Sequence, residues 1–275
     1  SSSPAGSPRR PPAAGTLALD QMELLAEVCN LFCKGHTPSA IARMLKEKGR
    51  ENVRREDPYQ FISYAASRGW MRFVPPHEHT LREKIRKRCG WLHDVEVVHT
   101  SVFEDVGYRG AEMLIGMLQQ QAVSKKVVHI GFAGGHAMRK LAWAFAQLLK
   151  EPAAGLPETV VFHSMVSGFD VYDPTTDPSA FFTYFVPDPA MRVKTAFVGL
   201  HTPALVRTEQ LAGMRKLEGI AECYEEKKNL DIIVTSASIW SDRDCLLRQY
   251  MEKSSKCAEA LVRAGCIGDM LWRPL

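Results

Sequence analysis

The sequence predicts an α/β protein in which a Rossmann-like domain, built on a mostly parallel sheet, follows a small all-α helix-turn-helix domain. Three short helical patterns come first, whereas strand-like apolar runs alternate with helical patterns from about residue 93 onward. The chain has 275 residues, of which 45% are hydrophobic, and this suffices to bury one large core and a smaller one. We therefore expect two folded domains of different class.

The domain boundaries follow from composition. Residues 1–16 contain mainly Ser, Pro, Ala, Gly and Arg, so we expect a disordered tail there. Residues 17–76 are expected to form the helix-turn-helix domain, residues 77–92 a charged linker, and residues 93–275 the α/β domain.

The first helix is expected from about Asp20 to the helix breaker Gly35. Its apolar residues recur at helical spacing and predict one buried stripe. The stripe comprises Met22, Leu25, Ala26, Cys29, Phe32 and Cys33.

The second and third helices each show a capping residue followed by proline. Thr37 precedes Pro38 and Asp57 precedes Pro58, and proline suits the first helical turn because its missing N–H would be unpaired there anyway. The inward residues are expected to be Ile41, Met44, Leu45, Phe61, Ile62 and Ala65, with the helices ending at Gly49 and Gly69.

Strands and helices alternate in the remainder of the chain. A short strand over residues 70–76 is expected to complete the first domain, an outline typical of winged or simple helix-turn-helix modules. The strands of the sheet are expected at residues 95–99, 127–131, 159–166, 195–200 and 230–237. The helices are expected at residues 105–121, 136–150, 178–185, 208–227 and 242–264.

Positive charge is concentrated in and just after the first domain. Residues 34–90 contain fourteen Lys or Arg and six Asp or Glu, whereas residues 91–275 contain nineteen and twenty-two. This asymmetry is typical of a nucleic-acid-binding module attached to a neutral body. A solvated helical surface would have the same composition, so charge alone leaves both interpretations open.

A glycine-rich turn follows the predicted strand 127–131. Gly134 and Gly135 lack the Cβ atoms that would keep a ligand away from the backbone. The N–H groups of Gly135, His136 and Ala137 would then point outward at the positive end of a helix, an arrangement that favours phosphate. Glycines needed only for a tight connection would give the same sequence.

A second turn of this kind follows the strand 230–237, where Thr235, Ser236 and Ser238 offer hydroxyl groups. The two turns reinforce each other, because open α/β sheets bind ligands at the carboxyl ends of their strands. The glycine-rich turn lacks the Lys-Ser/Thr of a Walker A loop and the glycine spacing of a dinucleotide fingerprint. We therefore expect no cofactor.

Seven segments, taken in order, carry a family resemblance. They are LLAEVCNLFCKGHTPSAIARMLKEKG, FISYAASRGWMRF, IGFAGGHAMRKLA, TDPSAFFTYF, LHTPALV, DIIVTSAS and AGCIGDM. Together they resemble the SorC family of bacterial sugar-responsive transcription regulators, whose relatives include the central glycolytic gene regulator and the deoxyribonucleoside regulator. The resemblance implies a sugar-phosphate effector domain of Rossmann-like type, a homo-oligomer, and control of an attached DNA-binding head.

The resemblance also implies which residues would bind the effector. These are Gly134, Gly135, His136, Ala137 and Met138 in the phosphate loop, Ser167 and Gly168 at the next strand end, Ser236, Ala237 and Ser238 in the final loop, and Asp269 in the Gly-Asp segment. His136 and Ala137 stand where the family has hydroxyl residues, and the sequence stops short of the family segment that supplies a lysine. We expect an altered effector or a degenerate pocket.

The DNA-binding candidates lie at the second and third helices. They are Thr37, Ser39, Arg54, Arg55, Tyr59, Gln60 and Ser63. The two arginines would bind phosphates, whereas Gln60 can pair with adenine. Glu56 and Asp57 at the start of the third helix would repel phosphates, and a solvated helix face would carry the same side chains.

Three functions fit these observations. The first is a DNA-binding transcription regulator whose α/β domain senses a phosphorylated sugar. The alternative is a metabolite-binding or scaffold protein of the same fold that has lost DNA recognition. The third is a sugar-phosphate isomerase-like enzyme, but its acid–base candidates form no recognisable catalytic pattern, so we expect no enzyme and no catalytic residue. These candidates are His129, His163, His201, Asp170, Asp173 and Asp231.

The expected partners are therefore duplex DNA and a phosphorylated sugar effector. The seven cysteines are dispersed without a CxxC pair, so we expect no metal site. No apolar run is long enough to span a membrane and the first residues lack the apolar core of a signal peptide, so the expected location is cytoplasmic.

Overall fold

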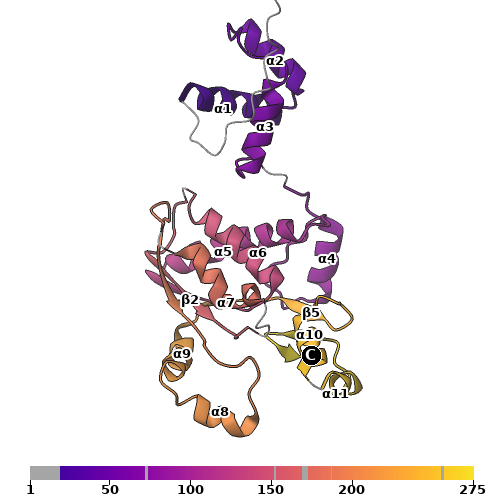
Figure 1. The fold of residues 1–275 in the computed structure, drawn as a ribbon, viewed down its shortest axis with the longest axis vertical. Helices are drawn as coiled ribbons and strands as arrows, with labels where there is room; N and C mark the ends of the chain where they lie inside the picture. Colours follow the sequence, from indigo (N-terminus) through magenta and orange to yellow (C-terminus); the bar gives the residue numbers. More distant parts are fainter. Residues whose placement is uncertain (1–18, 72–73, 152, 169–172, 187, 255–256) are drawn as a thin grey trace, which may run out of the picture. The chain divides into compact units, whose positions relative to one another are not determined.

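The computed structural model describes residues 19–71, 74–151, 153–168, 173–186, 188–254 and 257–275. The chain divides into two compact units, Ser1–Val74 and Pro75–Leu275, both drawn in Figure 1. The tail expected at residues 1–16 lies outside the described residues. The expected linker, residues 77–92, contains helix α4 (His79–Arg88) and clusters with the second unit.

The first unit is a three-helix domain, as expected. It contains α1 (Leu19–Cys33), α2 (Pro38–Glu47) and α3 (Asp57–Ser67). The hydroxyl of Thr37 caps α2 by accepting a hydrogen bond from the backbone N–H of Ala40 at 3.3 Å. The core of the first unit is formed by Val28, Leu31, Ile41, Leu45 and Val53.

The buried face predicted for α1 is wrong in part. Ala26, Phe32 and Cys33 are exposed, whereas Val28 and Leu31, which lie outside the predicted stripe, are buried beside Leu25. α1 carries apolar residues on more than one side, so periodicity alone does not select the face. The contacts that α1 makes with α2 and α3 select it.

The second unit contains a four-stranded sheet, which confirms the predicted α/β class. Its strands are β1 (Val127–Phe132), β2 (Thr159–Ser164), β3 (Lys194–Val198) and β4 (Ile232–Val234), in the order β3-β2-β1-β4. All three pairings are parallel, and β1 and β2 run in register from Val127 opposite Thr159. The carboxyl ends of the four strands therefore share one edge.

Two long helices cover one face of this sheet. In Figure 1, α5 (Phe103–Ala122) and α6 (His136–Leu148) lie side by side against it. Alternate residues of β1 and β2 point into this layer and are fully buried, because neighbouring side chains of a strand point to opposite faces. Phe162 of β2 also stacks on Phe185, with ring centroids 4.1 Å apart.

The remaining helices are shorter than predicted. They are η1 (Pro174–Thr176), α7 (Pro178–Phe181), η2 (Phe182–Phe185), α8 (Thr208–Met214), α9 (Ile220–Glu226), η3 (Lys227–Asn229), α10 (Leu246–Ser254) and α11 (Cys257–Arg263). The helix expected at residues 208–227 is broken before Gly219, whose φ of 79° no α-helix accommodates. The helix expected at residues 242–264 is divided into α10 and α11, and residues 255–256 between them lie outside the described part.

A second, antiparallel sheet was not predicted. It contains β5 (Ala237–Ile239), β6 (Gly268–Met270) and β7 (Arg273–Pro274), in that order. Gly268 is required here, because a Cβ at this position would lie 2.0 Å from the carbonyl oxygen of Ser238. The loop expected after the strand 230–237 is therefore partly replaced by β5, which contains Ser238.

Two predicted strands are absent from the described structure. Residues 95–99 form no sheet strand, and neither do the described residues of 70–76, of which 72–73 lie outside the description. Residues 95–99 instead run beside residues 76–78, with backbone hydrogen bonds of 2.8 Å from Glu78 to Val97 and from His99 to Pro76. These backbone groups are thus paired locally and not with the parallel sheet.

An ionic cluster explains why α4 belongs to the second unit. The carboxylate of Glu96, whose side chain is only 12% exposed, lies 2.9 Å from Nδ1 of His77, 3.4 Å from Arg82 of α4 and 3.2 Å from Arg109 of α5. Three donors from three segments thus meet one nearly buried carboxylate. Among the described residues, no helix is long and apolar enough to cross a membrane.

We predict that Glu96→Gln destabilises the second unit by about 1–3 kcal/mol, because it removes charge from several hydrogen bonds at once. Chemical denaturation followed by circular dichroism measures this change. Glu83→Gln is the matched control, since Glu83 is exposed and its ion pair among the described residues is with Arg86 at 3.7 Å. Equal stability of the two variants would contradict a joining role for Glu96.

Candidate functional site

The glycine turn lies at the carboxyl edge of the parallel sheet, between β1 and α6. Gly135 caps α6 with a φ of 110°, a conformation that only glycine adopts readily. Gly134 and Gly135 are buried, whereas His136 and Ala137 at the start of α6 are exposed. The turn therefore has the position that the sequence predicts, with the first turn of α6 open to solvent.

Groups of the chain itself occupy much of this turn. The N–H of Gly135 donates to the carbonyl oxygen of Thr176 at 2.8 Å. A Cβ on Gly134 would lie 2.7 Å from that same oxygen and 2.9 Å from Cζ2 of Trp272. Both glycines therefore have a structural reason that requires no ligand.

The end of β2 is occupied in the same way. The carbonyl oxygen of Ser167 accepts a hydrogen bond from Nε1 of Trp272 at 3.0 Å, and its hydroxyl donates to the carbonyl oxygen of Leu200 at 2.9 Å. The N–H of Gly168 donates to the carboxylate of Asp177 at 2.8 Å. The carbonyl oxygen and hydroxyl of Ser167 and the N–H of Gly168 thus have partners within the chain.

The other predicted effector residues are divided between two places. Met138 is buried in the main core, so its side chain cannot face a ligand at the surface. Ser236 is half-buried, and Ala237 is exposed at the start of β5. Ser238 and Asp269 meet in the second sheet, where the Ser238 hydroxyl donates to the buried Asp269 carboxylate.

Sequence reasoning missed three residues at this edge, namely Thr176, Asp177 and Trp272. The motif Asp177-Pro178 has the form of a helix cap, and Asp177 indeed accepts a hydrogen bond from the backbone N–H of Ser179 at 2.7 Å. No local pattern marks Trp272, because its role depends on the pairing of β6 with β7.

The exposed mouth of α6 carries mixed charge. Nη1 of Arg139 donates to the hydroxyl of Thr175 at 2.8 Å. That hydroxyl donates in turn to Asp173, and this hydrogen bond is the main reason why the pKa of Asp173 lies below its usual value. The positive charges of His136 and Arg139 lower the pKa of Asp173 further. The site therefore combines two basic side chains with one carboxylate.

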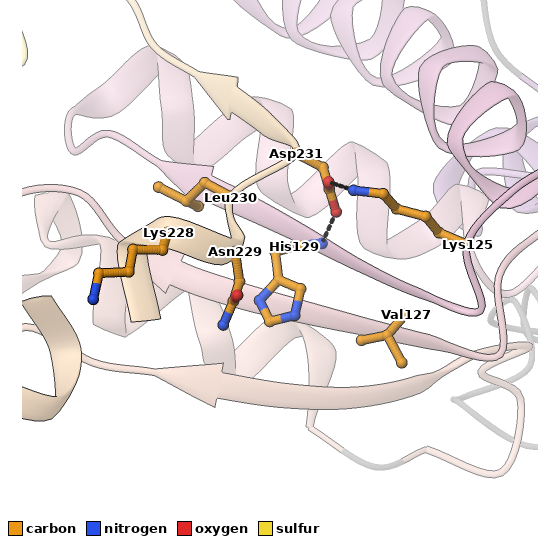
Figure 2. A pocket seen from close by; sticks show the side chains of 7 residues that line it. All are labelled: Lys125, Val127, His129, Lys228, Asn229, Leu230 and Asp231. Carbon is orange, nitrogen blue, oxygen red and sulfur yellow. Dashed lines mark hydrogen bonds and ion pairs between the residues drawn. The ribbon is translucent and has the colours of Figure 1, made fainter. Parts of the chain in front are cut away.

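A polar hollow of about 340 Å³ lies at the opposite edge of the sheet, by the amino ends of β1 and β4 (Figure 2). Its lining residues are Lys125, Val127, His129, Lys228, Asn229, Leu230 and Asp231. Figure 2 shows that Asp231 receives hydrogen bonds from the Lys125 ammonium and from the backbone N–H of His129. The lysine that approaches the hollow from this side is thus already neutralised.

His129 also joins this hollow to the buried His163. Nδ1 of His129 lies 2.8 Å from Nε2 of His163, so one ring must donate and the other accept. Burial is the main reason why the pKa of His163 lies below the ordinary 6.5, and the neighbouring His129 lowers it further.

The structure thus brings together three of the acid–base candidates, His129, His163 and Asp231, away from the glycine turn. His201 lies beside Gly199 after β3, Asp173 caps η1, and Asp170 lies outside the described residues. Among the described residues, no three His, Cys, Asp or Glu side chains are arranged to hold a metal ion.

In the first unit, the candidate DNA-contacting side chains are accessible. Tyr59, Gln60 and Ser63 are exposed on α3, and Arg54 and Arg55 are exposed in the connection before it. Thr37 is exposed but caps α2, and Ser39 is half-buried. These seven residues therefore include five whose side chains are exposed and not used for capping.

The start of α3 differs from the expectation by one residue. Glu56, not Asp57, is the N-cap, and its side chain makes no capping hydrogen bond. The Asp57 carboxylate accepts a hydrogen bond from the backbone N–H of Arg54 at 2.7 Å and so holds the connection between α2 and α3. Glu27 pairs with Lys48 at 2.7 Å and Arg50 at 3.5 Å, whereas Arg54 and Arg55 make no ion pair within the described part of the chain.

Comparison with known proteins finds likeness in structure. No protein-family model and no curated protein sequence matches the chain significantly. The full-length sorbitol operon regulator SorC from Klebsiella pneumoniae superimposes with a TM-score of 0.63 and 15% identity, over 94% of this chain and 80% of the other. A probable sor operon regulator from Shigella flexneri gives a TM-score of 0.54 and 16% identity, over 72% of each chain.

A DeoR family transcriptional regulator from Listeria monocytogenes gives a TM-score of 0.50 and 20% identity, over 71% of this chain and 72% of the other. The likeness to the Klebsiella protein extends across both units. The resemblance to SorC-type regulators that the sequence motifs indicate is therefore confirmed at the level of the fold.

We predict that the second unit loses stability as the pH falls below about 6.5, because the unfolded chain then binds a proton that the buried His163 resists. Above the pKa that His163 has in the unfolded chain, both states hold a neutral ring and stability does not depend on pH. Below that pKa, the unfolded chain binds the proton more readily than the folded one, so the free energy of unfolding decreases. Thermal unfolding between pH 8 and pH 5 measures the effect. His163→Gln should flatten this part of the pH profile, and an unchanged profile in the variant would contradict the assignment.

Proposed function

We propose that the chain is a DNA-binding transcription regulator whose α/β unit senses a phosphorylated sugar. The observation that carries this proposal is the order of parts. A three-helix unit precedes a parallel sheet with a glycine turn at its carboxyl edge, and a fold match to a sorbitol operon regulator spans both units of this chain.

The exposed side chains of the first unit support the DNA-binding half. Arg54 and Arg55 are free of ion pairs among the described residues and suit phosphate contacts. Gln60 on the exposed face of α3 suits a bidentate hydrogen bond to adenine. Asp57 repels DNA less than a free carboxylate would, because the backbone of Arg54 already donates to it.

The mouth of α6 supports the sensing half. His136 and Ala137 lie at the exposed, positive end of a 13-residue helix, and Arg139 lies one turn further along. A regulator needs only different ligand affinities in two states, about 1–3 kcal/mol, and no catalytic group. The side chains of His129 and His163 meet on the face of the sheet opposite α6 and not at the glycine turn, which supports a protein that is not an enzyme. We infer a cytoplasmic homo-oligomer from the same family resemblance.

The alternative, a metabolite-binding or scaffold protein that no longer binds DNA, is favoured by one observation. The turn predicted to bind phosphate is filled by Thr176 and Trp272 of the chain itself. DNA binding separates the two functions.

We predict that the full chain binds duplex DNA at low salt with an affinity that falls steeply as salt rises. Arg54→Ala together with Arg55→Ala should weaken binding and reduce the slope of log K against log salt by about 2. Fluorescence anisotropy with a random-sequence duplex measures both quantities. The matched control combines Arg243→Ala with Arg263→Ala, which remove the same charge from exposed positions of the second unit. Absence of binding at low salt would favour the scaffold.

We predict that hexose 6-phosphates raise the melting temperature of the chain by about 5–10 °C at a hundredfold excess over Kd, since they bind only the folded state. Ala137→Asp should abolish this shift, because a carboxylate at the start of α6 repels an anion while still suiting the helix dipole. Ala137→Ser is the neutral control and should retain the shift. If the melting temperature of Ala137→Asp still rises with the ligand, the ligand does not bind at the start of α6.

A further inference from the structure

The hairpin of β6 and β7 closes the glycine turn from within the chain. β6 and β7 pair through Met270 and Arg273, so only Leu271 and Trp272 form the connection. The indole of Trp272 lies against Gly134, and its N–H donates to the carbonyl oxygen of Ser167 at 3.0 Å. One side chain thus bridges the ends of β1 and β2, the two strands whose loops would bind the effector.

This connection has an unfavourable backbone conformation. Leu271 and Trp272 have φ values of 54° and 58° and are the only non-glycine residues with positive φ in the described chain. Two-residue hairpin turns with positive φ at both positions favour Asn-Gly, and bulky side chains adopt them at a cost. Such strain persists only where the surrounding structure compensates for it.

Side-chain packing provides that compensation. Leu271 packs against the main core of the second unit, and Trp272 packs with the buried Cys245 and Leu247. The closed hairpin is therefore a balance between turn strain, which favours opening, and the contacts of these two side chains, which favour closure. A ligand that competes for the surface of Gly134 would shift this balance.

We propose that Trp272 is an internal gate of the effector site, which excludes a phosphate-bearing sugar from the glycine turn until the hairpin moves. This inference rests on the proposed function for the identity of the ligand, but the closure itself does not. Because ring and ligand compete for one surface, removal of the ring raises the affinity for the ligand, and ligand binding changes the surroundings of the indole.

The test compares the full chain with its Trp272→Gly variant. Glycine suits the positive φ of the turn, so this variant removes the ring and relieves the strain together. Titration with hexose 6-phosphates, pentose 5-phosphates and inorganic phosphate is followed by calorimetry. We expect at least a fivefold lower Kd for the sugar phosphates, the lower bound of typical coupling between sites. Hydrogen exchange should also become faster at residues 134–138.

Two further variants control for unrelated effects. Trp272→Phe retains a ring but lacks the N–H that donates to Ser167, so it should increase the affinity for sugar phosphates less than Trp272→Gly does. Trp91→Gly removes a tryptophan that is 82% exposed, and it should leave both affinity and exchange unchanged. In the parent chain, sugar phosphates should alter the tryptophan emission, and this change should be smaller in Trp272→Phe.

The outcomes separate the gate from the proposed function. Faster exchange with tighter binding supports both. If hydrogen exchange is faster in Trp272→Gly but no variant binds a sugar phosphate, Trp272 still closes the turn and the proposed ligand is wrong. Unchanged exchange, or equal affinity of the parent chain and Trp272→Gly, overturns the gate even where the parent chain binds sugar phosphates and DNA.

Discussion

Burial of one face of β1 and β2 beneath α5 and α6 is the constraint on which the second unit depends. Val128, Ile130 and Phe132 alternate along β1, and Val160 and Phe162 continue the layer on β2. Because the two strands are parallel and in register, this packing fixes both ends of the sheet together. The glycine turn comes to the carboxyl edge, and the His129–His163 pair lies on the face opposite α5 and α6.

The two edges of the sheet differ in how their polar groups are satisfied. At the carboxyl edge, backbone groups of Gly135, Ser167 and Gly168 are paired with Thr176, Trp272 and Asp177. At the amino edge, Asp231 is paired with Lys125 and with the backbone of His129. Buried polar groups without partners destabilise a fold, so a ligand site that spends time empty benefits from partners within the chain. Under the proposed function, the glycine turn would exchange these internal partners for the ligand.

The second unit begins earlier in the chain than composition suggests, at Pro75, so it includes the expected linker over residues 77–92. Glu96 draws His77, Arg82 and Arg109 together, and this places α4 within the second unit. The last turn of α4 contains Arg86, Lys87 and Arg88, so the positive charge expected in the linker belongs to the second unit. These three side chains are exposed, so exposed basic residues occur on both units.

The sequence by itself determined the features that depend on local patterns. Caps, prolines and apolar spacing predicted three helices in the first unit, and buried apolar runs predicted the strands from Val127 to Val234 and the glycine turn before His136. The exposed candidates on α3 were also predictable, because one helix face follows from spacing alone. These features involve interactions among residues that are near in sequence.

Only the tertiary structure decided the features that depend on distant pairing. Residues 95–99 have the composition of a strand, but their backbone pairs with residues 76–78. Ser238 and Asp269 were predicted to bind a ligand, yet they meet each other in an antiparallel sheet that no periodicity indicated. Trp272 reaches Gly134 across more than a hundred positions of the chain, as its hydrogen bond to Ser167, 105 residues away, records. A sequence pattern specifies which groups need partners, but chain topology decides which partners they meet.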